Sequence, residues 1–207
     1  MPEQNSNKEH WENIYNSKKT EELSWTEDVP EISLAFIKNF QLPKTASIID
    51  IGGGESKLAE NLLDMGYVNI TVLDISKSSI QKAKMRLGKR ANKIKWMVQD
   101  VIDFDIDNQV DCWHDRAAFH FLTSLDQISK YAIKAKQYVK TNGYAVIGTF
   151  SENGPKNCSG LPIKQYNQET ISLAFADGFE KLSCINHEHQ TPFKTSQSFL
   201  YCSFQRI

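Results

Sequence analysis

The chain has 207 residues, of which 40% are hydrophobic and 24% are charged, and its 24 basic and 25 acidic side chains leave a net charge of −1. This composition excludes wholesale disorder and a disulfide scaffold, and the length fits one domain with an appendage. No apolar run reaches the roughly 18 residues of a membrane span, and the near-zero charge gives no reason to expect a nucleic-acid or membrane partner. The polar N-terminus lacks the apolar core of a signal peptide, so we expect a cytoplasmic location.

The first part of the chain predicts helices ahead of the main domain. Trp11 and Tyr15 share one face of a helical pattern, and a second helical pattern covers residues 29–40. After these helices the sequence changes to short apolar runs. We therefore expect an N-terminal helical cap or lid over residues 1–43 and the main domain over residues 44–207.

Strands alternate with helices in the main domain. Five short apolar runs predict strands at residues 47–51, 69–73, 94–98, 109–113 and 144–149. Helical patterns separate the first strand from the second, the second from the third, and the fourth from the fifth. This alternation predicts a parallel sheet covered by helices on both faces. Two late runs, at residues 179–187 and 197–205, predict an antiparallel hairpin at one edge of the sheet.

A triple glycine lies between the first predicted strand and a helix, in the stretch Asp50-Ile51-Gly52-Gly53-Gly54-Glu55-Ser56. Glycine allows the backbone to approach a ligand where a Cβ atom would clash. Two further acids, Asp74 and Asp100, end the second and third strands, at the sheet edge where ligands bind in open α/β folds. A carboxylate at Asp74 can accept hydrogen bonds from both hydroxyls of a ribose. The pattern predicts a cofactor that contains a nucleoside.

A nicotinamide cofactor fits this pattern less well. The dinucleotide fingerprint would need a third glycine at the position of Lys57. It also leaves Asp50 unexplained, because a carboxylate there suits an amine-bearing ligand better than a pyrophosphate. The chain is short for a separate substrate domain, so an oxidoreductase is disfavoured.

These residues resemble the motifs of class I S-adenosylmethionine-dependent methyltransferases. The family's acid-x-Gly-x-Gly motif appears at residues 50–54, with Ser56 where a third glycine is common, and its second- and third-strand acids appear as Asp74 and Asp100. The resemblance implies S-adenosyl-L-methionine as cofactor and S-adenosyl-L-homocysteine as product. It also implies a doubly wound, Rossmann-like, seven-stranded α/β sheet in the order 3-2-1-4-5-7-6, with the last strand antiparallel.

Two further features narrow the resemblance. The N-terminal aromatic residues and the stretch Trp113-His114-Asp115-Arg116 are similar to bacterial stand-alone methyltransferases and to the thiopurine and halide methyltransferase-like group. In that group an N-terminal aromatic segment covers the cofactor. The start of the chain also resembles some seven-stranded protein-lysine methyltransferases. The cofactor-binding residues implied are Trp11, Tyr15, Trp25, Asp50, Gly52, Gly53, Gly54, Ser56, Asp74, Ile75, Asp100, Val101 and His114.

Three polar residues at the end of the fourth strand are the catalytic candidates. His114 titrates near neutrality and could take a proton from the acceptor. Asp115 could orient His114 or bind an acceptor amine, and Arg116 could bind a carboxylate through two hydrogen bonds. Two alternatives stay open: Asp115 and Arg116 form a structural ion pair, or His114 only touches the cofactor.

The cysteines and late histidines predict no metal centre. His187 and His189 are too few ligands for a closed metal site. No C-x-x-C pair is present, and without a secretory signal the four cysteines are expected to be free thiols. Cys158 lies in the loop after the fifth strand, where it is an acceptor-side or a merely structural residue. The cysteines are Cys112, Cys158, Cys184 and Cys202.

Together these features predict an enzyme that transfers a methyl group by in-line displacement. The acceptor is expected to be a small molecule, and its identity and accepting atom are left open. One alternative is a protein-lysine methyltransferase, and an alternative of another class is a non-catalytic, cofactor-binding interaction module. The chain is expected to be a monomer or a weak homodimer.

Overall fold

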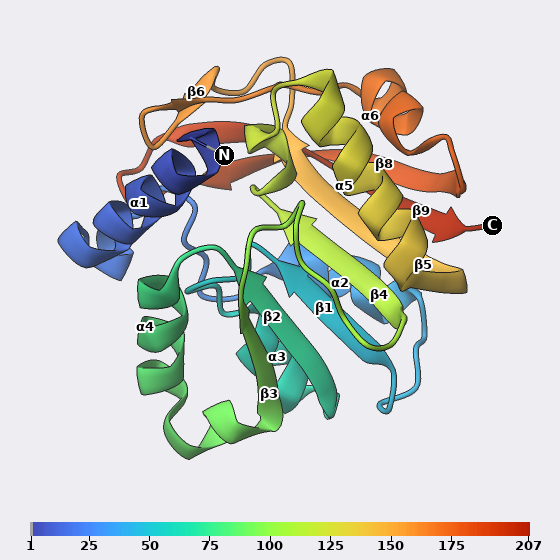
Figure 1. Ribbon diagram of the computed structural model, residues 1–207, viewed down its shortest axis with the longest axis horizontal. Coiled ribbons are helices and arrows are strands. Elements are labelled where there is room, and N and C mark those ends of the chain that lie inside the picture. Colours follow the sequence, from blue (N-terminus) through green and yellow to red (C-terminus); the bar gives the residue numbers. More distant parts are fainter. Residues whose placement is uncertain (1) are drawn as a thin grey trace.

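The computed structural model describes residues 2–207, with side chains described from residue 7 onward. Its centre is a seven-stranded sheet (Figure 1) with the order β3-β2-β1-β4-β5-β9-β8. The strands are β1 (Ser47–Ile51), β2 (Asn69–Asp74), β3 (Ile94–Val98), β4 (Val110–Arg116), β5 (Val139–Phe150), β8 (Phe179–Gln190) and β9 (Ser196–Arg206). Strands β1 to β5 pair in parallel, and β9 is antiparallel to both of its neighbours. Because β8 and β9 are the sixth and seventh strands of this sheet, the predicted order 3-2-1-4-5-7-6 is confirmed.

Helices cover both faces of the sheet (Figure 1). On one face, α2 (Glu31–Asn39), α3 (Leu58–Asp64) and the end of α4 (Lys77–Leu87) bury Leu34, Leu58 and Leu87 in a cluster with side chains of β1, β2 and β3. On the other face, α5 and α6 bury Tyr131 and Phe175 against β4, β5 and β9. The remaining elements are α1 (Pro2–Ser17), η1 (Thr20–Glu22), α2 (Glu31–Asn39), α3 (Leu58–Asp64), α4 (Lys77–Leu87), η2 (Gly88–Lys93), η3 (Phe119–Phe121), α5 (Leu125–Tyr138), β6 (Asn157–Cys158), β7 (Leu161–Pro162) and α6 (Gln168–Phe175).

Two helices that follow the strands begin at serine caps. The hydroxyl of Ser76 accepts the backbone N–H of Ser79 at 3.1 Å at the start of α4. At the start of α5, Ser124 accepts the N–H of Gln127 at 3.2 Å, and the Gln127 side chain accepts the N–H of Ser124 at 3.3 Å. Such caps satisfy N–H groups that have no partner within the helix, so they fix where each helix begins after its strand.

Strand β4 extends three residues beyond its prediction, which ended at Trp113. His114 pairs with Asp50, Asp115 with both Ile51 and Ile147, and Arg116 with Gly148. Three consecutive ionisable residues are unusual in a buried strand, because charged groups are costly to remove from water. Because residues 114–116 are all polar, the sequence pattern did not predict that β4 continues through the catalytic candidates.

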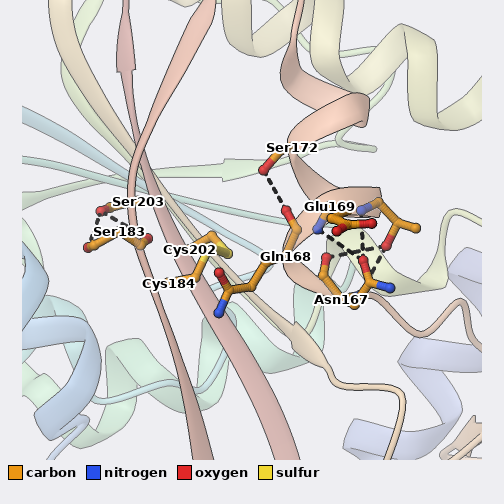
Figure 2. Close-up of a disulfide and its surroundings, with 9 residues drawn as sticks. Asn167, Gln168, Glu169, Ser172, Ser183, Cys184, Cys202 and Ser203 are labelled. Atoms are coloured by element: carbon orange, nitrogen blue, oxygen red, sulfur yellow. Dashed lines mark hydrogen bonds between the residues drawn. A yellow bond between two sulfur atoms is a disulfide. The ribbon is translucent and has the colours of Figure 1, made fainter.

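The prediction of four free cysteines is wrong for two of them. Cys184 on β8 and Cys202 on β9 lie directly opposite each other and form a disulfide (Figure 2). The next pair in the register, Ser183 and Ser203, has its hydroxyl oxygens 3.0 Å apart. The two cysteines are 18 residues apart in sequence, and only the register of the hairpin brings them together. Cys112 and Cys158 are free and buried.

The N-terminal helices differ in how they join the sheet. Helix α2 packs into the core of one face, whereas α1 lies beside α4 (Figure 1). The division into a cap over residues 1–43 and a domain over residues 44–207 stays a prediction. Within residues 2–207, no helix combines the length and the apolar character that crossing a membrane requires.

Candidate active site

The C-terminal ends of the parallel strands open into a cavity of about 390 Å³. Predicted residues from five parts of the chain line this cavity: Trp11, Tyr15, Trp25, Gly52, Asp74, Ile75, Asp100, Val101 and Arg116. A smaller cavity of about 50 Å³ lies behind the glycine loop. It adds four more predicted residues: Asp50, Gly53, Ser56 and His114. The fold thus brings most of the predicted cofactor-binding residues together, and Gly54 lies directly against one of them.

The glycines leave room for the two acids at the strand ends. A Cβ atom on Gly54 would lie 2.5 Å from Oδ2 of Asp74, and one on Gly53 would lie 2.5 Å from Oδ2 of Asp50. Gly54 also has a φ of +32°, in the region that disfavours side chains. Each glycine therefore allows the backbone to pass over a carboxylate that a larger residue would displace.

Asp74 and Asp100 present their carboxyl groups at adjacent strand ends. Oδ1 of Asp74 accepts the N–H of Ser76 at 2.8 Å, and Oδ1 of Asp100 accepts the N–H of Ile102 at 3.1 Å. Burial raises the pKa of Asp74 to about 7 and also raises the pKa of Asp100. Both groups line the large cavity, where a ligand hydroxyl or amine can supply the partners that water no longer supplies.

His114 does not face the large cavity. It is 2% exposed, and its two ring nitrogens lie 2.7 Å from Oδ1 of Asp50 and 2.8 Å from the hydroxyl of Ser33. Its imidazole is therefore engaged on both sides within the protein. This arrangement gives no support to the prediction that His114 takes a proton from the acceptor.

Asp115 is fully buried and holds the turn after β4. One oxygen accepts the N–H groups of Ala118 and Phe119, and the other accepts the hydroxyl of Tyr131 at 2.6 Å. Burial raises the pKa of Asp115 to about 6, and it lines neither cavity. The geometry assigns it a structural role, which differs from the predicted contact with an acceptor amine.

Arg116 pairs with Glu27 rather than with its neighbour Asp115. Its Nε donates to the hydroxyl of Tyr201 at 2.7 Å, and its Nη1 donates to the carbonyl of Trp25 at 2.7 Å. Nη2 lies 3.3 Å from the Glu27 carboxylate, yet no hydrogen-bond partner is found for it in the described part of the chain. Arg116 lines both cavities, so this nitrogen is the remaining donor of a largely occupied guanidinium.

Aromatic rings from the N-terminal segment wall the large cavity. The ring centroid of Trp11 lies 5.9 Å from that of Trp25 and 5.0 Å from that of Phe121, and Tyr15 lies 6.4 Å from Trp25. The predicted lid residues thus form one cluster, which Phe121 joins from η3. Phe121 carries no sequence signal beyond being apolar, so sequence reasoning missed it.

Glu12 fixes the N-terminal helix over the site and was also missed. Its carboxylate accepts the backbone N–H of Lys77 at 2.5 Å and that of Ser78 at 3.2 Å, at the N-terminus of α4. Helix α4 has no acid in its own first turn. That lack of a local acid was the only hint in the sequence, because an acid at a helix N-terminus is favourable.

His189 joins the same lid segment from the end of β8. Its Nε2 donates to the carbonyl of Ser24 at 2.7 Å, and its Nδ1 lies 3.4 Å from Glu27. His189 therefore packs against the chain between η1 and α2.

Known proteins resemble this chain in sequence and in fold. Residues 48–143 match a family model described as a methyltransferase domain. The chain is 23% identical to human EEF1A lysine methyltransferase 2 over 199 residues, which cover 88% of this chain and 78% of that protein. It is 24% identical to a ubiquinone biosynthesis O-methyltransferase of Rickettsia typhi over 119 residues, 58% of this chain and 47% of that protein. The crystal structure of a SAM-dependent methyltransferase from Anabaena variabilis superposes with a TM-score of 0.75 at 15% identity, covering 97% of this chain and 95% of that chain.

Proposed function

Because this chain is a class I S-adenosylmethionine-dependent methyltransferase, we propose that it methylates a small molecule whose accepting atom is already ionised near neutral pH. The proposal rests on the residues that line the 390 Å³ cavity. Its described walls include Arg116 and contain no histidine. The match to the methyltransferase domain makes the chain an enzyme.

The residues present fit the cofactor. Asp74 lies at the end of a strand, next to Gly54, where any side chain would collide with its carboxylate. This carboxylate can accept hydrogen bonds from both ribose hydroxyls. Oδ2 of Asp50 is buried and has no hydrogen-bond partner within the described residues, so an ammonium group of the ligand would satisfy it. When bound, S-adenosylmethionine supplies a methyl group on a positively charged sulfur, which is transferred by in-line displacement.

The aromatic cluster prepares the cavity for this chemistry. A sulfonium is attracted to the faces of aromatic rings, and Trp11, Tyr15 and Trp25 line the cavity on the lid side. The rings also exclude water, which favours a reaction in which opposite charges cancel. The enzyme then has mainly to hold the acceptor atom on the axis of the bond that breaks.

In this proposal Asp74 and Asp100 bind the cofactor, and Asp126 pairs with Lys130 at 2.8 Å, so the remaining cavity walls have little capacity to remove a proton. Burial raises the pKa of Tyr15, and it raises the pKa of Cys158 to about 11, so both stay protonated near neutral pH. The two histidines near β4, His114 and His120, are buried outside the large cavity. An acceptor that brings its own ionised nucleophile, such as a carboxylate, a thiolate or an acidic phenol, needs no such base.

Arg116 supports an anionic acceptor over a lysine side chain, although Glu27 at 3.3 Å offsets part of its charge. A guanidinium binds carboxylate-like groups and repels an ammonium group. Protein-lysine methylation remains the second candidate, because the similarity to the human lysine methyltransferase extends over 88% of this chain. The two candidates differ in the charge of the acceptor, which makes them separable.

A screen for cofactor turnover tests the proposal. Release of S-adenosylhomocysteine would be measured with small carboxylates, thiols and phenols, each beside its neutral ester or ether, and with lysine-bearing proteins. We expect release with an anionic small molecule and none with its neutral counterpart. Release with lysine-bearing proteins alone would establish the second candidate instead.

An Arg116→Gln variant is expected to lower kcat/KM for the anionic acceptor about 100-fold, because a charge-assisted contact contributes about 1.5–3 kcal/mol. Binding of S-adenosylhomocysteine, measured by calorimetry, should change less than about 3-fold. The matched control is Tyr201→Phe, which removes only the hydroxyl that accepts from Nε of Arg116. The control should keep the preference for anions, and equal losses in both variants would contradict a direct role of Arg116.

A further inference from the structure

The carboxylate of Asp50 is held by one oxygen only. Oδ1 lies 2.7 Å from Nδ1 of His114, whereas Oδ2 is buried without a hydrogen-bond partner in the described chain. Oδ2 lies beneath Gly53, where a side chain would approach it to 2.5 Å. An unpaired carboxylate oxygen inside a protein is costly unless a ligand completes its bonding.

His114 is placed beside Asp50 by the sheet and is supported from a helix. It pairs with Asp50 in the register of β1 and β4, and its other nitrogen, Nε2, lies 2.8 Å from the hydroxyl of Ser33 on α2. These three side chains are 1–2% exposed. They also share the walls of the 50 Å³ cavity behind the glycine loop.

The partners decide which nitrogen of His114 carries a proton. An ionised carboxylate can only accept hydrogen bonds, so Nδ1 must be the donor to Asp50. The hydroxyl of Ser33, which can donate or accept, lies 2.8 Å from Nε2 on the other side of the ring. Asp50 thereby fixes the proton on Nδ1, and Ser33 supports the ring from its other side, so that His114 holds Asp50 in one orientation.

We propose that His114 is a positioning residue, which with Ser33 orients Asp50 so that Oδ2 accepts a hydrogen bond from the amino group of the cofactor's amino-acid tail. The inference rests on the assignment of the chain as a methyltransferase and is independent of the acceptor. In this role His114 controls the affinity for the cofactor and does not transfer a proton. It also makes α2, through Ser33, a contributor to the cofactor site.

Two thioether ligands separate this role from a general effect on the loop. S-adenosylhomocysteine carries the amino-acid tail, and 5′-deoxy-5′-methylthioadenosine lacks it. Calorimetry on the full chain would measure both for wild type and for two isosteric variants. His114→Asn keeps an amide donor near the position of Nδ1, whereas His114→Gln places the amide near Nε2 and leaves Asp50 without its partner.

The expected pattern is selective. His114→Gln should weaken S-adenosylhomocysteine about 10- to 100-fold and methylthioadenosine less than about 3-fold, because only the former uses the oriented oxygen. His114→Asn should restore the affinity for S-adenosylhomocysteine to within about 3-fold of wild type. In an Asp50→Asn background, His114→Gln should have little further effect, since coupled residues are not additive.

Three results would overturn the inference. Equal losses for both ligands would show that His114 shapes the whole loop, and wild-type affinity in His114→Gln would show that it does nothing for binding. A wild-type chain that binds neither ligand would remove the cofactor assignment itself, an outcome distinct from the first two. Ser33→Ala is a second variant for the case that His114→Gln does not fold. It should weaken the binding of S-adenosylhomocysteine alone, by about 3- to 10-fold.

Discussion

Replacing Asp74 with alanine is expected to weaken the binding of S-adenosylhomocysteine at least 100-fold. The ribose can donate two hydrogen bonds to this carboxylate, and each bond to a charged group contributes about 1.5–3 kcal/mol. Calorimetry would measure the affinity, and circular dichroism would confirm that the variant is folded. Asp107→Ala is the matched control, because its side chain is 89% exposed and lies outside both cavities. Unchanged affinity in Asp74→Ala would contradict the assignment of the ribose site.

The same carboxylate should make binding depend on pH. Burial raises the pKa of Asp74 from 3.8 to about 7, and ribose hydroxyls bind the ionised form best. Affinity for S-adenosylhomocysteine should therefore fall up to about tenfold per pH unit below pH 7 and level off above it. Asp74→Asn should remove this dependence.

The stability of the ligand-free protein should have the opposite pH dependence. A carboxyl group whose pKa is raised on folding contributes stability below the unfolded pKa of 3.8, and this contribution is lost as the pH rises through about 7. The bound nucleoside compensates that loss by supplying partners to the ionised group. Proton release on binding near pH 6, measured in buffers of different ionisation enthalpy, checks the linkage.

The second large effect is expected from Gly54→Ala, which should abolish detectable cofactor binding. A Cβ atom there would lie 2.5 Å from Oδ2 of Asp74 and 3.0 Å from the hydroxyl of Ser79, so the ribose acid must move. The φ of +32° adds backbone strain of about 1–3 kcal/mol.

A glycine at the other end of α4 separates strain from steric conflict. Gly88 has a φ of +56°, but nothing lies within 4 Å of the position of its Cβ atom. Gly88→Ala should therefore lower the free energy of unfolding by about 1 kcal/mol and leave binding of S-adenosylhomocysteine unchanged. If Gly54→Ala bound this ligand as tightly as Gly88→Ala, the close approach of Gly54 to Asp74 would have no functional meaning.

Much of the sheet could be predicted because its strands follow simple rules. The bounds of β1 and β3 match the predicted ranges, and the alternation of strands and helices leaves few possible orders for a parallel sheet. The acids at the strand ends could be predicted to lie together for the same reason. These features depend on local patterns and on topology, both of which can be inferred from the sequence.

The roles within the stretch from His114 to Arg116 could not be predicted in the same way. Successive side chains on a strand point to opposite faces, so Asp115 lies on the face opposite His114 and Arg116. The prediction ended the strand at Trp113 and therefore lost this alternation. With β4 continued to Arg116, the same rule separates Asp115 from the site without any structure.

The long-range partners had no local signal at all. The disulfide between Cys184 and Cys202 depends on the register of a hairpin, in which a shift of one residue would separate the sulfur atoms. Glu12 reaches a helix that begins 65 residues later in the chain. Both contacts follow from how finished elements pack, which a single sequence does not specify.

The start of helix α4 has a consequence for the kind of ribose that the proposed site would accept. Each backbone N–H group from Ser76 to Ser79 donates a hydrogen bond. The N–H of Ser76 donates to Asp74, those of Lys77 and Ser78 donate to Glu12, and that of Ser79 donates to the Ser76 hydroxyl. Free N–H groups at a helix N-terminus are what commonly bind phosphate. A nucleotide phosphorylated on the ribose would here meet two carboxylates and no available donor. If the cofactor binds here, the N-terminal helix would, through Glu12, favour an unmodified nucleoside over its 2′- or 3′-phosphate.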